Sequence, residues 1–82
     1  MKHGISFEDA RDAFLDTYAI DFPDQRFDYG EDRYNLIGMV KGRLLFVSYT
    51  IRKDAVRIIS VRGAVPHEQR KYYRSNRQMG KI

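Results

Sequence analysis

Three β-like runs in quick succession constrain the fold of this chain more than any other feature. They are "RYNLIGMV" at 33–40, "LLFVSYTI" at 44–51 and "VRIISV" at 56–61. A Lys-Gly turn joins the first two, and Gly42 can adopt the positive φ that a tight hairpin needs. The "RKDA" stretch supplies a second turn before the third run. This pattern predicts a small antiparallel sheet.

A helix and a short strand are predicted before these runs. Ser6 and Asp9 form an S-x-x-D start, a capping-box variant that favours a helix over 7–15, with Phe7 on its apolar face. "YAIDF" at 18–22 is a short first strand that ends at a proline, and a polar loop follows it.

A second helix is predicted after the last run. Pro66 stands where a first-turn proline belongs, so the helix is expected over 66–77. The order is then helix, four strands, helix, which indicates one α+β domain spanning residues 1–82. Two helices give a sheet this apolar only modest cover, and leftover apolar surface would favour a protein partner.

Composition narrows the function classes. Hydrophobic residues are 43% and charged residues 32%, which is ordinary for a globular chain. The chain has no cysteine, which excludes disulfides and thiolate nucleophiles. Its two histidines lack ligand spacing, and no glycine-rich phosphate loop is present, so neither a metal nor a cofactor is expected. Without a signal-like or membrane-spanning run, we expect a soluble cytoplasmic protein.

Charge is distributed unevenly along the chain. Residues 1–51 carry nine acidic and six basic side chains, whereas residues 52–82 carry two acidic and nine basic ones. Clustered lysine and arginine favour a polyanionic partner, because they displace counterions from phosphates. The alternative is a basic tail that only confers solubility.

The junction between the last strand and the last helix carries the most reactive set of side chains. Glu68 and Tyr72 are four apart and share one helix face, and Arg62 ends the strand just before them. A carboxylate, a phenol and guanidinium groups suit phosphodiester cleavage without a metal. A second helical stripe is basic and has the titratable His67 beside it; it comprises Arg70, Arg74 and Arg77 with Lys71 close by.

A structural interpretation of the same residues competes with the catalytic one. Glu68 could pair with Arg62 or Arg70, Tyr72 could pack against the sheet, and the other arginines could be a solvated face. Arg57 raises a further question, because it is five residues before Arg62. Simple alternation puts the two on opposite faces of the sheet, unless a bulge or the strand end brings them together.

Several blocks of the sequence resemble, in order, the BrnT family of small bacterial toxins. They are "KHGISFEDARDAF", "GEDRYNLIG", "GRLLFVSYT", "VRIISVRGA" and "EQRKYY", which together cover the chain from Lys2 to about Tyr73. The resemblance implies a ribonuclease toxin with a RelE-like α+β fold that cuts RNA without a metal. It also implies a partner, a BrnA-like antitoxin with a ribbon-helix-helix DNA-binding domain, through which the complex reaches operator DNA.

The resemblance also implies roles for individual residues. Arg33 matches an E-x-R element, Arg57 and Arg62 match "RIISAR", and Glu68 and Tyr72 match "ExxxY". Glu68 would then be the general base or orienting acid, with Arg62 and Arg57 stabilising the phosphorane. His3, from the family's "KHG", or Tyr72 would donate a proton. Four cationic residues would bind RNA, namely Arg33, Arg70, Lys71 and Arg74.

The chain departs from the family pattern in two places. Family members carry an additional N-terminal element before "KHG", which we expect to be missing here, and their loop often has a histidine where this chain reads "RFDYGED". The alternative function is therefore an inactive, truncated toxin that binds the antitoxin and acts in operon repression. A stand-alone RNA-binding domain is a third hypothesis.

Overall fold

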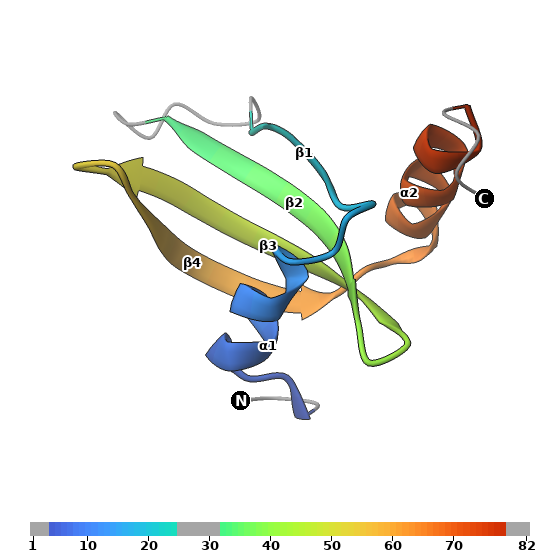
Figure 1. The fold of residues 1–82 in the computed structure, drawn as a ribbon, viewed down its shortest axis with the longest axis horizontal. Coiled ribbons are helices and arrows are strands. Elements are labelled where there is room, and N and C mark those ends of the chain that lie inside the picture. The colour runs from blue at the N-terminus through green and yellow to red at the C-terminus, as the bar shows by residue number, and fades with distance from the viewer. Residues whose placement is uncertain (1–3, 25–31, 79–82) are drawn as a thin grey trace.

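The computed structural model describes residues 4–24 and 32–78. Within them, the elements in chain order are α1 (Phe7–Ala13), β1 (Ile20–Pro23), β2 (Arg33–Val40), β3 (Arg43–Arg52), β4 (Ala55–Gly63) and α2 (Pro66–Gln78). The strands form one antiparallel sheet in the order β1-β2-β3-β4 (Figure 1). The predicted α+β order of helix, four strands and helix is confirmed.

Two tight turns close the hairpins as predicted. Lys41 and Gly42 connect β2 to β3 with φ values of 52° and 77°. Lys53 and Asp54 connect β3 to β4 with φ values of 50° and 64°. Two successive positive φ angles are the signature of the type I′ turn, whose twist matches that of the flanking strands.

Helix α1 begins with the predicted capping box and packs through small residues. The Ser6 hydroxyl accepts the Asp9 N–H at 3.1 Å, and the Asp9 carboxylate accepts the Ser6 N–H at 3.2 Å. Ala10 and Ala13 are fully buried, whereas Phe7, which was expected on the apolar face of the helix, is 50% exposed. The apolar face of α1 is therefore narrower than predicted.

Both N-terminal elements differ from their predicted bounds, because local hydrogen bonds compete with regular structure. α1 ends at Ala13, since the N–H of Leu15 donates to the carbonyl of Asp12 in a tighter, three-residue bond. β1 starts two residues later than predicted, because the Tyr18 N–H donates to Oδ1 of Asp16 at 2.9 Å and holds this segment in a turn.

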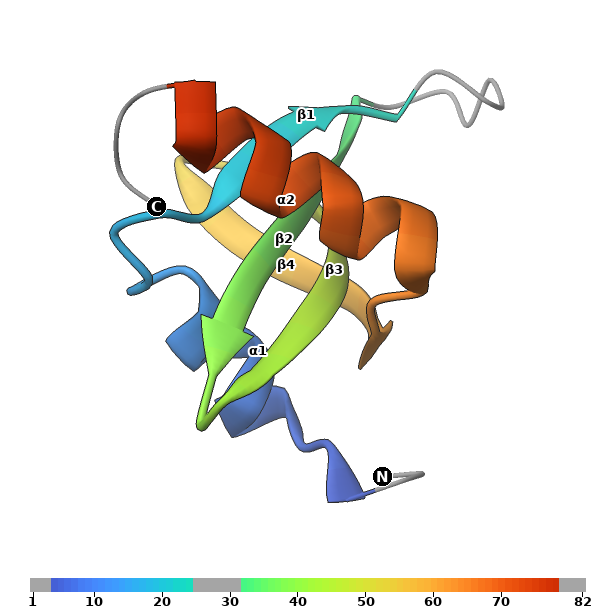
Figure 2. The same cartoon turned by 90° about the vertical axis from the view of Figure 1, so that its right-hand side faces the viewer.

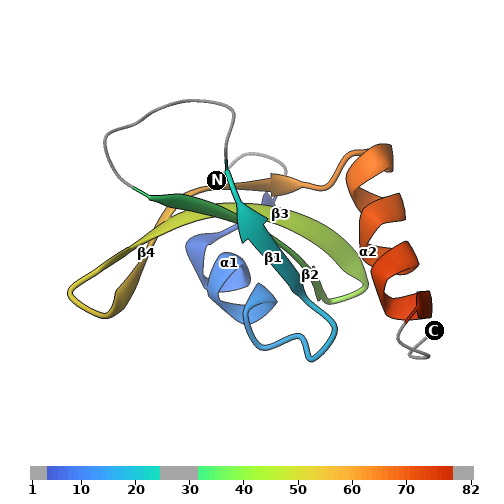
Figure 3. The same ribbon diagram turned by 90° about the horizontal axis from the view of Figure 1, so that it is seen from above.

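The two helices cover opposite faces of the sheet (Figure 3). α1 lies on one face over a core that includes Leu36, Leu45 and Val47. α2 lies at one end of the other face, where it crosses β1 and β2 (Figure 2) over a second core that includes Ile37, Phe46 and Tyr72. Alternation along each strand supplies both cores, because neighbouring side chains point to opposite faces.

Within residues 4–24 and 32–78, neither helix covers the end of the sheet near the β3–β4 turn. Ile51 and Val56 face each other across β3 and β4, and each is 52% exposed. Among the described residues, no helix covers the face under α2 at this end either, as Figure 3 shows. The side chains on that open surface are polar, and they form the candidate site.

Candidate functional site

A β-bulge interrupts the pairing of β3 with β4. Ser48 pairs with Ser60. The next residue of β3, Tyr49, pairs with Ile58, so Ile59 is left without a partner in the register. One extra residue on one strand reverses the alternation of faces beyond it.

The bulge puts Arg57 and Arg62 on the same face of the sheet. Arg57 lies opposite Thr50, and Arg62 lies opposite Phe46. Thr50 and Phe46 are an even number of residues apart on a regular strand, so their side chains share a face. Without the bulge, two residues five apart on a strand would point to opposite faces; the unpaired Ile59 puts both arginines on one face. The bulge that was considered for this strand from the sequence is therefore present.

Polar and basic residues extend from α2 to the open end of this face. Each lies at a position that alternation and register assign to the face under α2. We call this set the polar strip; it consists of Arg33, Asn35, Ser48, Thr50, Arg52, Arg57, Ser60 and Arg62. Its midpoint is uncharged, where the Ser48 hydroxyl donates to Oδ1 of Asn35 at 3.0 Å.

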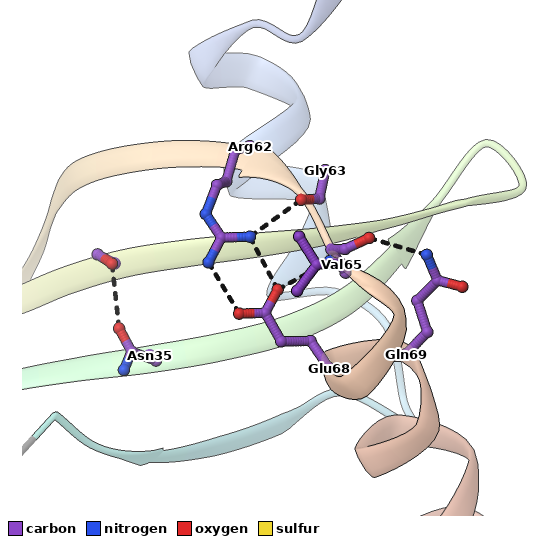
Figure 4. A network of polar contacts seen from close by, with 8 residues as sticks. Asn35, Arg62, Gly63, Val65, Glu68 and Gln69 are labelled. Atoms are coloured by element: carbon purple, nitrogen blue, oxygen red, sulfur yellow. Dashed lines mark hydrogen bonds and ion pairs between the residues drawn. The ribbon is translucent and has the colours of Figure 1, made fainter.

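Arg62 and Glu68 form a bidentate ion pair at the α2 end of the polar strip (Figure 4). The Nη1–Oε1 and Nη2–Oε2 distances are both 2.8 Å. Glu68 is only 6% exposed, whereas the Arg62 side chain is 48% exposed. The guanidinium also lies 4.3 Å from the centre of the Phe46 ring, which fixes its orientation. The ion pair considered in the structural interpretation is therefore present.

Glu68 also caps α2. Its Oε1 accepts the N–H of Val65 at 2.9 Å, and its own N–H donates to the Val65 carbonyl. Val65 precedes the first helical residue, so Glu68 occupies the third position of the helix, where an acid reaches back to the cap. This local geometry explains why the carboxylate points toward the strand rather than into solvent.

Burial alone would raise the pKa of Glu68. The hydrogen bonds from Arg62 and from the Val65 N–H, together with the charges of Arg62 and His67, outweigh burial, so the net pKa lies below its ordinary value. The carboxylate is thus ionised and is a weak base as long as Arg62 remains its partner.

A pocket of about 200 Å³ opens beside the ion pair. His67, Glu68 and Lys71 line it from α2, together with Phe22, Pro23, Asp24, Asn35 and Phe46 from the sheet side. The Lys71 ammonium lies 3.5 Å from the centre of the Phe22 ring. An imidazole, a carboxylate and an ammonium group therefore meet in one pocket. His67 was noted in the sequence but was assigned no role in the site. Its position next to Glu68 in the first turn of the helix was the signal that could have identified it.

Arg57 belongs to a different pocket from Glu68. It lines a cavity of about 300 Å³ with Arg33, Thr50 and Arg52 of the polar strip and with Ile58 and Ile59. Arg57 and Arg62 share a face but not a pocket. Arg52 was not among the predicted site residues, and its position becomes apparent only from the strand register.

Tyr72 is part of the core rather than the pocket. It is 2% exposed, and its hydroxyl donates to Oδ2 of Asp16 at 2.7 Å. Burial, with the hydrogen bond and the charge of Asp16, raises the pKa of the phenol above its ordinary value. Glu68 and Tyr72 do share a helix face, as predicted. The expectation that Tyr72 donates a proton to RNA disagrees with this placement, because its proton is engaged and inaccessible.

The predicted basic stripe of α2 is present, and Lys71 lies on the surface beside it. Lys71 faces the pocket beside Glu68. Arg70, Arg74 and Arg77 instead line an open hollow with Tyr73 on the other side of the helix. The three arginines therefore share one surface as predicted, and Lys71 points to the neighbouring surface because residues one apart on a helix point about 100° apart. Their roles in RNA binding stay predictions.

Three further expectations concern His3, a metal site and a membrane-spanning helix. His3 lies outside the described residues. Within 4–24 and 32–78, no three histidine or acidic side chains gather so as to hold a metal ion. In the same part of the chain, no helix has the length and apolar character needed to cross a membrane.

Comparison with known proteins identifies the class and then the family. A family model that describes ribonuclease toxins of type II toxin–antitoxin systems matches residues 1–68. Since the match covers 68 of the 82 residues, the chain belongs to this family, BrnT. A search of curated proteins finds no match. The family inferred from the sequence blocks is confirmed, and the matched region contains Arg33, Arg57, Arg62 and Glu68.

Proposed function

We propose that this chain is a metal-independent endoribonuclease toxin whose active site is the pocket beside the Arg62–Glu68 ion pair. The observation that carries the proposal is the bidentate pair itself, in which a half-exposed guanidinium orients a buried carboxylate beside His67 and Lys71. Membership in a family of ribonuclease toxins supports the reaction class.

The reaction that suits these groups is transesterification at a phosphodiester. The ribose 2′-oxygen attacks the adjacent phosphorus while its proton passes to the Glu68 carboxylate. The bond from phosphorus to the 5′-oxygen breaks, and the leaving oxygen receives a proton from the His67 imidazolium. The products are a 2′,3′-cyclic phosphate and a 5′-hydroxyl. Arg62 donates hydrogen bonds to the phosphorane, where negative charge accumulates.

Substrate binding would also activate the base. In the free chain Arg62 holds Glu68 at 2.8 Å through both oxygens, which keeps the carboxylate a weak base. Arg62 is accessible, and guanidinium groups bind phosphate bidentately. A phosphate that draws Arg62 away from Glu68 removes the interaction that lowers the pKa of the carboxylate. Its proton affinity would then rise when the 2′-hydroxyl is in place.

Cleavage of a defined RNA by the purified chain in the presence of EDTA tests the proposal. We expect cleavage that is abolished in Glu68→Gln, and no cleavage of the same RNA with a 2′-deoxyribose at the cut site. Arg11→Ala removes an exposed charge from α1, on the opposite face of the sheet, and serves as the control, with activity retained. Cleavage that survives Glu68→Gln, or that requires added metal, would overturn the assignment.

A second candidate function is antitoxin binding without catalysis. The observation that favours it is that both carboxylate oxygens of Glu68 already accept hydrogen bonds, from Arg62 and from the Val65 N–H. In this function a cognate antitoxin, proposed to be BrnA-like with a ribbon-helix-helix domain, would bind the chain in the cytoplasm and carry it to operator DNA. A stable complex with the antitoxin and no RNA cleavage would support it. The RelE-like relationship of the fold also remains a proposal.

A further inference from the structure

We propose that Arg33, Arg52 and Arg57 form a second phosphate subsite, separate from the cleavage pocket, that binds the same RNA strand at a distance from the bond being cut. The inference rests on the proposed ribonuclease function for the identity of the strand. It reassigns Arg57 from the scissile phosphate to substrate positioning.

Strand register brings the three arginines together. Arg33, Thr50 and Arg57 lie directly opposite one another across β2, β3 and β4. Arg52 is two residues from Thr50 on the same face. All four line one pocket of about 300 Å³ at the end of the sheet that α2 leaves open. Arg52 and Arg57 are exposed, so a ligand in solution can reach them.

The chemistry of this pocket suits a phosphate group. Guanidinium groups are planar donors that match phosphate oxygens and remain charged at all physiological pH values. Three guanidinium groups line this one pocket, which favours an anionic ligand. Thr50 is 3% exposed, and its hydroxyl donates to the carbonyl of Asp32. Thr50 therefore forms the floor of the pocket rather than a ligand.

The polar strip connects this subsite to the cleavage pocket. Arg57 lies opposite Thr50 and Arg62 lies opposite Phe46, four positions apart on β3. At roughly 3.3 Å per residue this separates them by about 13 Å. A stacked strand rises roughly 3.4 Å per nucleotide, so at most about four nucleotides fit between the two sites. The intervening side chains are Asn35, Ser48 and Ser60, which are neutral hydrogen-bonding groups that suit sugars and base edges.

Binding to an uncleavable RNA gives the first test. The full chain is titrated with a labelled 2′-O-methyl RNA over a range of salt concentrations, using Arg57→Gln, Arg52→Gln and the control Arg11→Gln. We expect each subsite variant to weaken binding about tenfold and to reduce the salt slope by about 1. Arg11→Gln removes an equal charge from the exposed side of α1, on the opposite face of the sheet, and is expected to bind like the original chain. Equal losses in all three variants would overturn the subsite.

Substrate length gives the second test, which a merely structural effect would not reproduce. A dinucleotide contains only the scissile phosphate, whereas a longer RNA also reaches the second pocket. We expect Arg57→Gln to raise KM for the longer RNA and to leave kcat/KM for the dinucleotide unchanged. An equal loss of kcat/KM on both substrates would show that Arg57 acts at the scissile phosphate and would overturn the inference.

The two proposals can fail independently. If the chain cleaves no RNA, the ribonuclease proposal fails, and the binding titration alone still decides whether the arginine pocket holds phosphate. If the chain cleaves RNA but Arg57→Gln and Arg52→Gln bind like the original chain, the subsite fails and the ribonuclease proposal stands.

Discussion

The Tyr72 hydroxyl donates to Oδ2 of Asp16 at 2.7 Å, although the two residues are 56 positions apart in the chain. The same carboxylate oxygen accepts the Met39 N–H at 2.8 Å. One acidic side chain thereby joins α2, β2 and the segment after α1. Asn76 adds a second connection, because its amide donates to the Tyr18 carbonyl at 3.1 Å. Helix α2 is held in place by these polar contacts as well as by its apolar face.

Replacing the phenol separates the structural and catalytic interpretations of Tyr72. We expect Tyr72→Phe to reduce the free energy of unfolding by about 1–2 kcal/mol, because Asp16 loses a hydrogen bond at a half-buried site. Cleavage per folded molecule should be unchanged. Urea unfolding and RNA cleavage at a temperature well below the midpoint provide the two measurements. A chain with normal stability and no activity would instead make Tyr72 a proton donor.

Acid should destabilise the fold through Asp16. Burial would raise the pKa of Asp16, but the N–H groups of Met39 and Tyr18 and the Tyr72 hydroxyl outweigh it, so the net pKa is lowered. A carboxyl whose pKa is lower in the folded state stabilises the fold above its unfolded pKa. That stabilisation is lost as the pH falls through the folded pKa.

The measurement is the free energy of unfolding of the chain and of Asp16→Asn, from neutral pH to about pH 3. We expect the variant to be less stable at neutral pH and to lose less stability on acidification. The pKa of Glu68 is also lowered, so Glu68 likewise stabilises the fold at neutral pH and loses this contribution in acid. The Asp16→Asn variant keeps the contribution of Glu68, so its stability still falls somewhat on acidification. Parallel pH profiles for the two proteins would contradict the role of Asp16.

The Arg62–Glu68 pair can be measured by a double-mutant cycle. Arg62→Ala, Glu68→Gln and the double variant should give a coupling free energy of about 1–3 kcal/mol, because the pair is bidentate and one partner is buried. Exposure of Arg62 keeps the value below that of a fully buried pair. Additive effects of the two substitutions on unfolding would show that the pair does not form in solution.

Gly38 sets how closely α1 approaches the sheet. A Cβ added there would lie 2.5 Å from the carbonyl oxygen of Ala13, which is backbone and cannot move without the helix. We expect Gly38→Ala to cost about 1–3 kcal/mol of stability through overpacking. Gly63→Ala is the matched control, because its Cβ would meet only the flexible end of the Arg43 side chain at 3.2 Å. Equal unfolding midpoints for both variants would contradict this packing.

Elements governed by local chemistry were predictable from the sequence. The capping box of Ser6 and Asp9, the positive φ of Gly42 and the first-turn position of Pro66 all depend on residues close in the chain, and all are confirmed. The ends of the N-terminal elements were less predictable. There the Asp16 side chain competes for a backbone N–H, which periodicity does not reveal.

The site was predictable in composition but not in arrangement. The sequence indicated Arg62 and Glu68 as neighbours across the strand–helix junction, since only six positions separate them. It could not place Arg57 or Arg52, because their pocket depends on the register of three strands. Nor did it reveal the engagement of Tyr72, whose partner is distant in the chain.

The extra residue in β4 limits which insertions and deletions the fold tolerates between Arg57 and Arg62. Loss of one codon there, such as that of Ile59, would leave Ile58 opposite Tyr49 and Ser60 opposite Ser48. Arg57 and Arg62 would remain on the same face of the sheet, and β4 would keep its register with β3. A regular strand would then replace the bulge. Gain of one codon would force a second unpaired residue or shift the strand. Relatives of this gene are therefore expected to vary here by deletion rather than by insertion.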